Sequence, residues 1–424
     1  MATRSRRVDY AQEHAVGLVR VLDAVRLGRV TTKPEAARVT GLGRNVVTQR
    51  VNQLMEAGLL AEGRLQKSTG GRAPRGLRFR AETGRVLVAE LGVTSISVGL
   101  SDLAGALLVQ HEERAEVSDG PVSILNRVAG LWEQQLLTSA DEGPPVWGIG
   151  IGLPGPVEFA TGRPVAPPVM PGWDEFDVRS FLSQRFDAPV WVDNEVNVMA
   201  LGELRAGLAQ GVTDLVYVKV GSGIGAGLVT KGSLHRGAQG CAGDIGHVTV
   251  DESATILCRC GKYGCLEALA GGAALAREGE RAAREGRSTF LARVLDRDGL
   301  VDAQAVGTAA NHGDPVAVEL LTQSARLVGV TMARFVNFFN PSLILLGGGV
   351  SHAGDPYLAE IRHTILGRSL PLATRSLQIS RSPLGDEAGM RGAAFMVMDA
   401  LLSPDLILSW LPNGSPVGHA ELTA

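Results

Sequence analysis

Long hydrophobic runs are missing from this sequence. No stretch of 18 apolar residues occurs in its 424 positions, which excludes a membrane-spanning helix. The first ten residues are basic, but the apolar core of a signal peptide does not follow them, and we therefore expect a cytoplasmic protein. With 45% hydrophobic and 20% charged residues, the composition is that of a soluble globular chain of two or three domains.

Cysteine is also scarce, with four residues in the chain, yet three of the four lie within eight positions. These are Cys258, Cys260 and Cys265, and His247 stands eleven residues before the first of them. One imidazole and three thiolates form a closed tetrahedral set of the kind that holds structural zinc. Buried free thiols and a disulfide are the alternatives. Zinc is favoured because cysteine clusters in cytosolic proteins are more often metal sites or catalytic.

The net charge of −3 hides an uneven distribution. Residues 1–80 hold 16 of the 41 Lys and Arg residues but only 6 of the 44 Asp and Glu residues, a balance of +10. The remaining positions hold the other 25 basic and 38 acidic residues, a balance of −13. A basic segment on an acidic body is expected when one part of a protein meets a polyanion and the rest does not.

Three helices are predicted within a domain at about residues 10–82. Residues 12–27 carry one apolar face at helical spacing. A second helix begins near Thr32 and ends near Thr40, and a third runs over about 42–57. A helix, a short turn and a second helix with a polar face form the helix-turn-helix arrangement.

The polar face of the third helix predicts a DNA contact. Asn, Gln and Arg pair with base edges in the major groove, and Thr bonds there or touches a methyl group. A basic β-hairpin is predicted next, suited to phosphates or to the adjacent minor groove. A small protein-interaction module is the alternative, but the helix spacing, the turn and the hairpin together favour DNA. The predicted DNA-binding residues are Arg44, Asn45, Thr48, Gln49 and Asn52, flanked by Arg50 on the helix, with Lys67, Arg72 and Arg75 on the hairpin.

A second domain, at about residues 84–403, shows strands separated by Gly-rich turns and helices, an α/β pattern. Its segments Val86–Val109 and Leu215–Gly232 look like distant copies, each with two apolar strands around a turn that contains Gly. Closely spaced glycines allow backbone N–H groups to approach phosphates, although tight hairpins need glycine in any case. Residues 404–424 are expected to form an irregular tail. The candidate nucleotide-binding glycines are Gly221, Gly223, Gly225, Gly347 and Gly348.

The His–Cys cluster and its surroundings resemble the signature of the ROK family (repressors, open reading frames and kinases). The resemblance extends from about Gln12 to about Leu402 and includes the loop Gly152–Val157. It implies an α/β fold with two actin/hexokinase-like lobes, as in sugar kinases, and a ligand in the cleft between them. It also implies a winged helix-turn-helix in front of this domain, which many members of the family carry.

Kinases of the family have the turn Asp-x-Gly-Gly-Thr-Lys, which faces the phosphates of ATP, and the first hairpin departs from it. Glu90 replaces the Asp, Val93 the second Gly and Ser95 the Lys. A cation is thereby lost, and the β-branched valine restricts the turn. Glu195 stands where family kinases have the Asp that takes a proton from the sugar, and its side chain is one methylene longer. These departures indicate a poor kinase.

The positions that contact the sugar in the family match the family's pattern more closely than the kinase turn does. Ionised carboxylates accept strong hydrogen bonds from vicinal hydroxyl groups, and zinc would fix their loop. The alternative role for Asp244 and Glu267 is capping of a turn or helix end, and Trp173 either stacks on a sugar or covers the core. The resemblance implies a sugar site of Asn194, Glu195, Asp244, His247 and Glu267, and a zinc site of His247, Cys258, Cys260 and Cys265.

These features favour a sugar-responsive transcriptional regulator, most of all a repressor that binds operator DNA and is released by a sugar or sugar phosphate. Operators with two half-sites imply a homodimer or homotetramer. The chief rival is an active ATP-dependent sugar kinase, similar to glucokinase, that carries a DNA-binding domain. A constitutive DNA-binding protein is disfavoured by the retained Asn194, His247 and Glu267.

Overall fold

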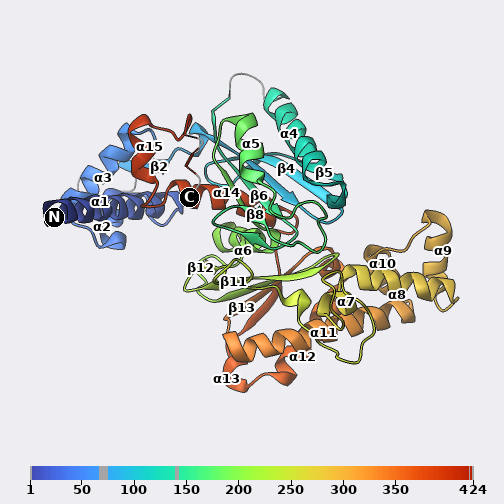
Figure 1. Ribbon diagram of the computed structural model, residues 1–424. Helices are drawn as coiled ribbons and strands as arrows, with labels where there is room; N and C mark the ends of the chain where they lie inside the picture. The colour runs from blue at the N-terminus through green and yellow to red at the C-terminus, as the bar shows by residue number, and fades with distance from the viewer. Residues whose placement is uncertain (1, 66–74, 139–142, 420, 423–424) are drawn as a thin grey trace.

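In the computed structural model, residues 2–65, 75–138, 143–419 and 421–422 are described (Figure 1). An N-terminal helical unit lies on the left of the figure, and two α/β lobes lie one above the other beside it. No helix within the described residues combines the length and the apolar character needed to cross a membrane.

The N-terminal unit consists of three helices and a two-stranded antiparallel hairpin. Thr32 caps the second helix: its hydroxyl accepts from the Glu35 N–H, and the Glu35 carboxylate accepts from the Thr32 N–H. Leu18, Val51 and Leu54 are fully buried in its core. This is the predicted winged helix-turn-helix arrangement. Its elements are α1 (Ala2–Arg26), α2 (Lys33–Thr40), α3 (Arg44–Glu56), β1 (Leu60–Leu65) and β2 (Arg75–Phe79), and η1 (Ala81–Thr83) follows.

The first lobe is built on a five-stranded sheet with the order β5-β4-β3-β6-β9. Strands β3, β4 and β5 form an antiparallel meander, whereas β6 and β9 run parallel to β3. Side chains alternate across β3, so that Leu87 faces α4 and α5 while Val88 faces the centre of the molecule. The elements are β3 (Arg85–Leu91), β4 (Ser95–Asp102), β5 (Leu107–Arg114), η2 (Val117–Asp119), α4 (Pro121–Thr138), β6 (Val146–Leu153), β7 (Val157–Glu158), β8 (Arg163–Pro164), α5 (Val178–Phe186) and β9 (Val190–Asn194).

The second lobe repeats this topology, with the order β12-β11-β10-β13-β14. An antiparallel meander again precedes two strands that run parallel to its first strand. The two sequence segments that looked like copies are therefore the opening hairpins of equivalent lobes. The strands are β10 (Leu215–Val220), β11 (Ile224–Thr230), β12 (Ser233–His235), β13 (Leu343–Gly347) and β14 (Gln378–Arg381). The helices are η3 (Ile245–His247), α7 (Leu266–Ala270), α8 (Gly272–Arg284), α9 (Thr289–Asp298), α10 (Ala303–Asn311), α11 (Pro315–Phe339), η4 (Gly349–His352), α12 (Asp355–Arg368) and α13 (Pro371–Thr374).

Two helices at the centre of the molecule, α6 (Glu195–Ala206) and α14 (Glu387–Leu401), pack directly against each other. A Cβ atom at Gly202 would collide with the Ala388 carbonyl, and one at Gly392 would collide with the Val198 carbonyl. Glycine is required at both positions because the two backbones touch there.

The C-terminal segment contains α15 (Ile407–Trp410) and η5 (Leu411–Asn413), and α15 lies against α1 (Figure 1). Trp410 is fully buried, with its ring 5.3 Å from that of Trp147 in the first lobe. One continuous hydrophobic core joins these side chains to α1, α6 and α14. The N-terminal unit is thus packed onto the body rather than tethered to it by a linker.

Candidate functional site

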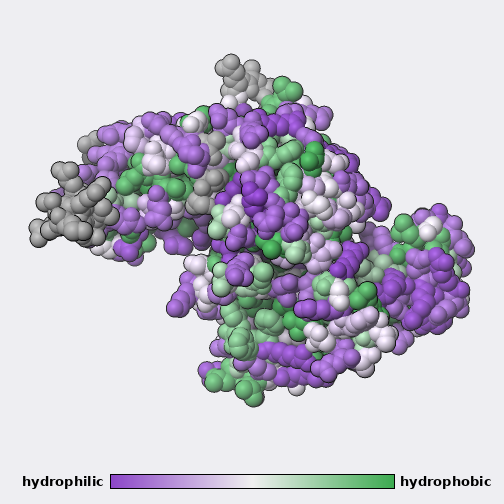
Figure 2. All heavy atoms as spheres, viewed as in Figure 1, coloured by the Kyte–Doolittle hydropathy of each residue, from purple (hydrophilic) through white to green (hydrophobic). Residues whose placement is uncertain are grey.

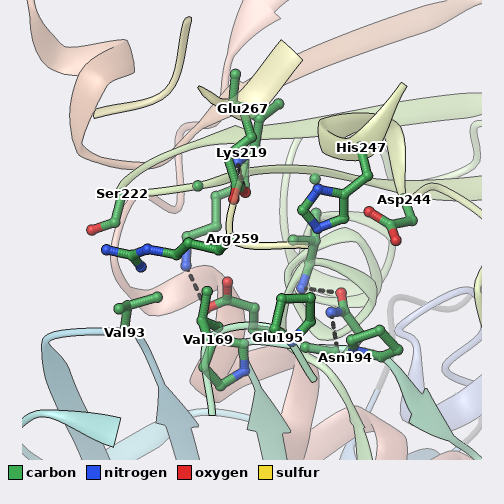
Figure 3. A pocket seen from close by; sticks show the side chains of 18 of the residues that line it. Val93, Val169, Asn194, Glu195, Lys219, Ser222, Asp244, His247, Arg259 and Glu267 are labelled. Carbon is green, nitrogen blue, oxygen red and sulfur yellow. Dashed lines mark hydrogen bonds and ion pairs between the residues drawn. The ribbon is translucent and has the colours of Figure 1, made fainter. Parts of the chain in front are cut away.

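A cavity of about 350 Å³ lies between the two lobes (Figure 3). All five residues predicted to contact a sugar line it, although they come from positions up to 73 residues apart in the chain. The first-lobe side includes Val93, Pro154, Gly155, Asn194 and Glu195, and the second-lobe side includes Lys219, Ser222, Asp244, His247, Arg259 and Glu267.

Asn194 is the N-cap of α6. Its side-chain oxygen accepts hydrogen bonds from the N–H groups of Val196 and Asn197, at 2.9 and 3.4 Å. Its side-chain nitrogen donates to the Gly155 carbonyl at 2.9 Å. The amide therefore fixes the start of α6 and the loop opposite, and it places Glu195 on the first turn of the helix.

Lys219 is a central residue of the cavity that sequence reasoning missed. Its ammonium lies 2.5 Å from the Glu195 carboxylate (Figure 3). The Glu90 carboxylate is 3.9 Å from the same ammonium. Burial raises the pKa of Glu90 to about 8, against the attraction of Lys219. Burial would lower the pKa of Lys219, but the carboxylates of Glu195 and Glu90 outweigh it and the pKa is raised. Lys219 therefore stays charged and forms an ion pair with the carboxylate of Glu195.

A second ion pair joins the lobes beside the first. Arg236 donates to the buried carboxylate of Asp193 at 2.7 Å, and its guanidinium stacks on the Phe159 ring at 3.7 Å. Asn197 donates to the other Asp193 oxygen at 2.9 Å. The acidic residue before Asn194 thus has a structural role in holding the two lobes together.

Glu267 lies against the Gly-rich turn of the second hairpin. Its carboxylate accepts from the Ile224 N–H at 3.1 Å, and a Cβ atom at Gly223 would collide with it. A Cβ atom at Gly347 would likewise collide with the Tyr217 side chain, and one at Gly348 with the Val220 backbone. The close packing of these neighbours is a sufficient reason for glycine at the three positions, and a bound nucleotide is not needed to account for it. Of the five candidate nucleotide-binding glycines, Gly223 and Gly225 line the cavity, while Gly221, Gly347 and Gly348 do not.

Asp244 and His247 lie side by side at the edge of the cavity (Figure 3). Asp244 is exposed, and its carboxylate makes no hydrogen bond to another described residue. Asp244 does not have the alternative capping role, because its side chain makes no hydrogen bond to the start of η3. Its oxygens are therefore available to hydroxyl groups of a ligand.

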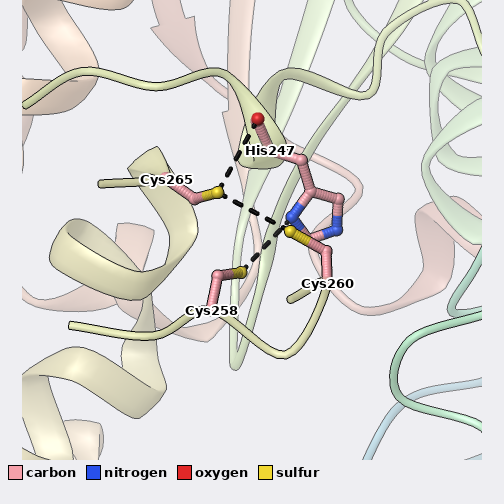
Figure 4. Close-up of side chains that lie close together, drawn as sticks. All are labelled: His247, Cys258, Cys260 and Cys265. Carbon is pink, nitrogen blue, oxygen red and sulfur yellow. Dashed lines mark hydrogen bonds between the residues drawn. The ribbon is translucent and has the colours of Figure 1, made fainter. Parts of the chain in front are cut away.

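The candidate metal centre consists of the four predicted residues (Figure 4). The His247 Nδ1 lies 3.5 Å from the Cys258 sulfur, the Cys260 and Cys265 sulfurs are 3.7 Å apart, and all four donor atoms lie within 4.8 Å of one another. A tetrahedron of ligands about 2.3 Å from zinc has edges of about 3.8 Å, so the donor set fits the ion. In this structure the four cysteines of the chain are free thiols.

The loop that carries the cysteines is shaped by glycine. Gly261 and Gly264 have φ angles of +83° and +70°, and a Cβ atom at Gly264 would collide with the Asp251 carbonyl. Burial raises the pKa of Cys265 to about 12 when no ion is present, so metal binding at neutral pH must displace a proton from this thiol. His247 Nδ1 faces the sulfurs, which leaves Nε2 free to contact a ligand.

The candidate DNA interface is the polar face of α3. The five residues predicted there are exposed, whereas Val47, Val51 and Leu54 are buried as expected. Arg50 was expected to flank the exposed face, but it is 7% exposed and bonds to His14 and Gln53. This expectation was wrong because Arg50, three residues after Val47 and four before Leu54, lies on the buried face of α3, towards α1. The exposed residues are Arg44, Asn45, Thr48, Gln49 and Asn52.

On the hairpin, Arg75 is exposed and forms an ion pair with Glu62 across the two strands. Lys67 and Arg72 lie outside the described residues.

Trp173 was expected with equal weight to stack on a sugar or to cover the core. Its side chain is fully buried, and its indole N–H donates to the Val117 carbonyl at 3.0 Å. It belongs to the core of the first lobe.

Comparisons with known proteins extend these observations. Residues 86–400 match the ROK family. A xylose repressor of Caldicellulosiruptor bescii is 30% identical over 90% of this chain and 95% of its own length. A crystal structure of a ROK family transcriptional regulator, a homolog of the E. coli Mlc protein, covers 95% of this chain with 26% identity and a TM-score of 0.81, and all of its own chain is matched. A glucokinase of Halalkalibacterium halodurans is 32% identical over 73% of this chain and 93% of its own.

Proposed function

The chain belongs to the ROK family, and we propose that it is a transcriptional repressor that binds operator DNA and is released by a sugar or sugar phosphate. One observation carries this proposal. The similarity to a xylose repressor spans 90% of this chain, whereas the similarity to a glucokinase spans 73% of it. The similarity to the repressor therefore extends beyond the sugar-kinase-like lobes into the N-terminal unit.

The cavity between the lobes is proposed as the effector site. Its volume falls within the range of small-molecule pockets. Asp244, His247 and Glu267 present two carboxylates and an imidazole along one wall, a set suited to a polyhydroxylated ligand. Zinc at the Cys cluster would fix this wall, because His247 belongs to both groups and Glu267 follows Cys265 by two residues.

Operator DNA is proposed to bind at α3, supported by the exposed polar side chains of that helix and the +10 balance of residues 1–80. Two half-sites call for two copies of the chain. Exposed apolar side chains gather at one corner of the second lobe, around α13 (Figure 2). This corner is the candidate contact of a homodimer or homotetramer, and it contains Phe338, Leu366, Leu370 and Leu372.

The proposal is tested with duplex DNA selected from a random library by the full-length protein. Binding of the selected duplex is measured by fluorescence anisotropy at several salt concentrations, with and without D-xylose or D-glucose. We expect a steep loss of affinity with salt, since each phosphate contact contributes a slope of about −0.9. We also expect weaker binding in the presence of one of the sugars. Failure of the protein to enrich any duplex sequence would contradict the proposal.

Replacement of Gln49 by alanine should weaken binding of the selected duplex by about 1–3 kcal/mol and relax the preference at one base pair. The side chain is exposed on the polar face of α3, where a bidentate contact with adenine is possible. Gln323→Ala, on the exposed surface of α11, is the matched control and should leave binding unchanged. Arg72→Ala, at a position outside the described residues, should instead weaken binding to all sequences alike. Equal loss on every sequence for Gln49→Ala would rule out base recognition by this residue.

A further inference from the structure

Four charged side chains meet where the N-terminal unit joins the body. Arg26, the last residue of α1, has a side chain that is 3% exposed. Its guanidinium donates to Asp399 at 2.7 Å and lies 3.1 Å from Asp23. Arg205 binds the other oxygen of Asp399 at 2.8 Å. One carboxylate on α14 therefore holds the helix of the N-terminal unit and the end of α6 at the same time.

Helix α6 connects this cluster to the cavity. It begins at Glu195, beside Lys219, and Arg205 lies in its last turn. Its 12 residues span about 18 Å, so a displacement at the cavity reaches Arg205 through one rigid element. Helix α14 reaches the same end of the molecule, and its Gly389 lies against Glu90, which is 3.9 Å from the cavity residue Lys219.

The contact between α6 and α14 leaves little room for a displacement to be absorbed. Their backbones touch at Gly202 and Gly392, so at these two points no side chain can rearrange to take up a shift. Packed interiors shift between discrete arrangements rather than deforming continuously. A movement of α6 therefore changes either the position of α14 or the geometry of the Arg205–Asp399 pair.

The stability of the charge cluster depends strongly on the position of Asp399. The Nη1 atom of Arg26 is buried without a hydrogen-bond partner among the described residues. The guanidinium thus depends on Asp399 and Asp23 alone for compensation of its charge. Breaking one partner of a buried ion pair leaves an uncompensated charge and is strongly unfavourable. Loss of the Asp399 contact therefore favours a new position for the end of α1.

We propose that Asp399 is the residue through which ligand binding between the lobes changes the position of the DNA-binding unit. The proposal rests on the proposed function, because it assigns the regulation of that same site. Ligand contacts at the start of α6 move Arg205 relative to Asp399, and the shared carboxylate transmits this movement to Arg26. The arrangement is a positioning device, since none of the three residues lines the cavity or lies on the exposed face of α3.

Two variants of the full-length protein test this coupling. Asp399→Asn removes the shared charge, and Arg205→Gln cuts the link to α6 while leaving the Arg26–Asp399 pair intact. For each, the affinity for the selected duplex is measured with and without saturating D-xylose or D-glucose. Sugar binding is measured separately by calorimetry. Asp405→Asn is the matched control, because Asp405 pairs with Gln12 of α1 at 3.2 Å in an exposed contact of the same interface.

In the wild-type protein, coupling of ordinary strength makes the sugar weaken DNA binding by about 5- to 150-fold. We expect this factor to fall below about twofold in Arg205→Gln, with sugar affinity unchanged, and to stay at the wild-type value in Asp405→Asn. Asp399→Asn should show the same loss of response. An undiminished sugar effect in Arg205→Gln, or loss of sugar binding in that variant, would overturn the proposal. A wild-type protein that ignores sugar would count against the proposed function instead, so the two failures are distinguishable.

Discussion

The Cys260→Ala protein should be purified without zinc, whereas the wild-type protein should carry one ion per chain. Alanine leaves three ligands, and the closed tetrahedral set that fits the ion is lost. The thiols of Cys258 and Cys265 would then stay buried and protonated, since burial raises the pKa of both. Because His247 belongs to the cluster and Glu267 follows Cys265 by two residues, the response to sugar should disappear together with part of the stability.

Elemental analysis and thermal unfolding measure the two effects. In a domain of 150–250 residues, each kcal/mol of stability corresponds to about 2–4 °C in the melting temperature. Cys241→Ala is the matched control, because Cys241 is exposed and lies outside the cluster. It should keep the full zinc content. A wild-type protein without zinc after purification under reducing conditions would falsify the assignment, and so would a mapped Cys258–Cys265 disulfide.

The metal centre could be predicted from the sequence because its ligands are close together along the chain. The four residues lie within 19 positions, and glycine turns between them close the loop. The helix-turn-helix was predictable for the same reason, since its capping box, its turn and its apolar spacing are local. The equivalence of the two lobes could also be predicted, because both opening hairpins carry the same pattern of apolar strands and glycine.

Lys219 could not be predicted in the same way, because its partners come from strand β3 and helix α6, which are distant from β10 in the sequence. Glu90 and Lys219 occupy equivalent positions, each two residues before the turn glycine of its hairpin, and that symmetry was the available signal. Nothing in the sequence indicates that the two side chains meet across the cleft. The Arg26–Asp399 pair is a more extreme case, because its members are 373 positions apart in the sequence.

The docking of the C-terminal segment on α1 was hidden for a related reason. Residues 404–424 contain three prolines and no long periodic pattern, so an irregular tail was the natural expectation. The segment instead contains the short helices α15 and η5, and it is anchored by the burial of Trp410 against Trp147. Such anchoring depends on a pocket formed by distant elements, and no local pattern reports it.

The wild-type protein should bind a sugar without phosphorylating it at a useful rate. Phosphoryl transfer requires a phosphate clamp, a metal-bound nucleotide and a base aligned on the attacking hydroxyl. Val93 and Ser95 have replaced two residues of the clamp, and Val93 lines the cavity. Glu195, which is predicted to stand at the position of the kinase base, is paired with Lys219 at 2.5 Å, so its carboxylate is already engaged by a cation.

The defects act on different parts of one transition state, so their effects on rate should compound. Displacement of a catalytic group by about 1 Å costs on the order of 10² in rate, and loss of a general base costs about 10²–10⁴. Kinases turn over at about 1–100 per second, so we expect less than about 0.01 per second here with D-glucose or D-xylose and ATP. The sugar should still release DNA, with no requirement for ATP. An authentic glucokinase assayed in parallel validates the measurement, and turnover near one per second in this protein would place the kinase hypothesis first.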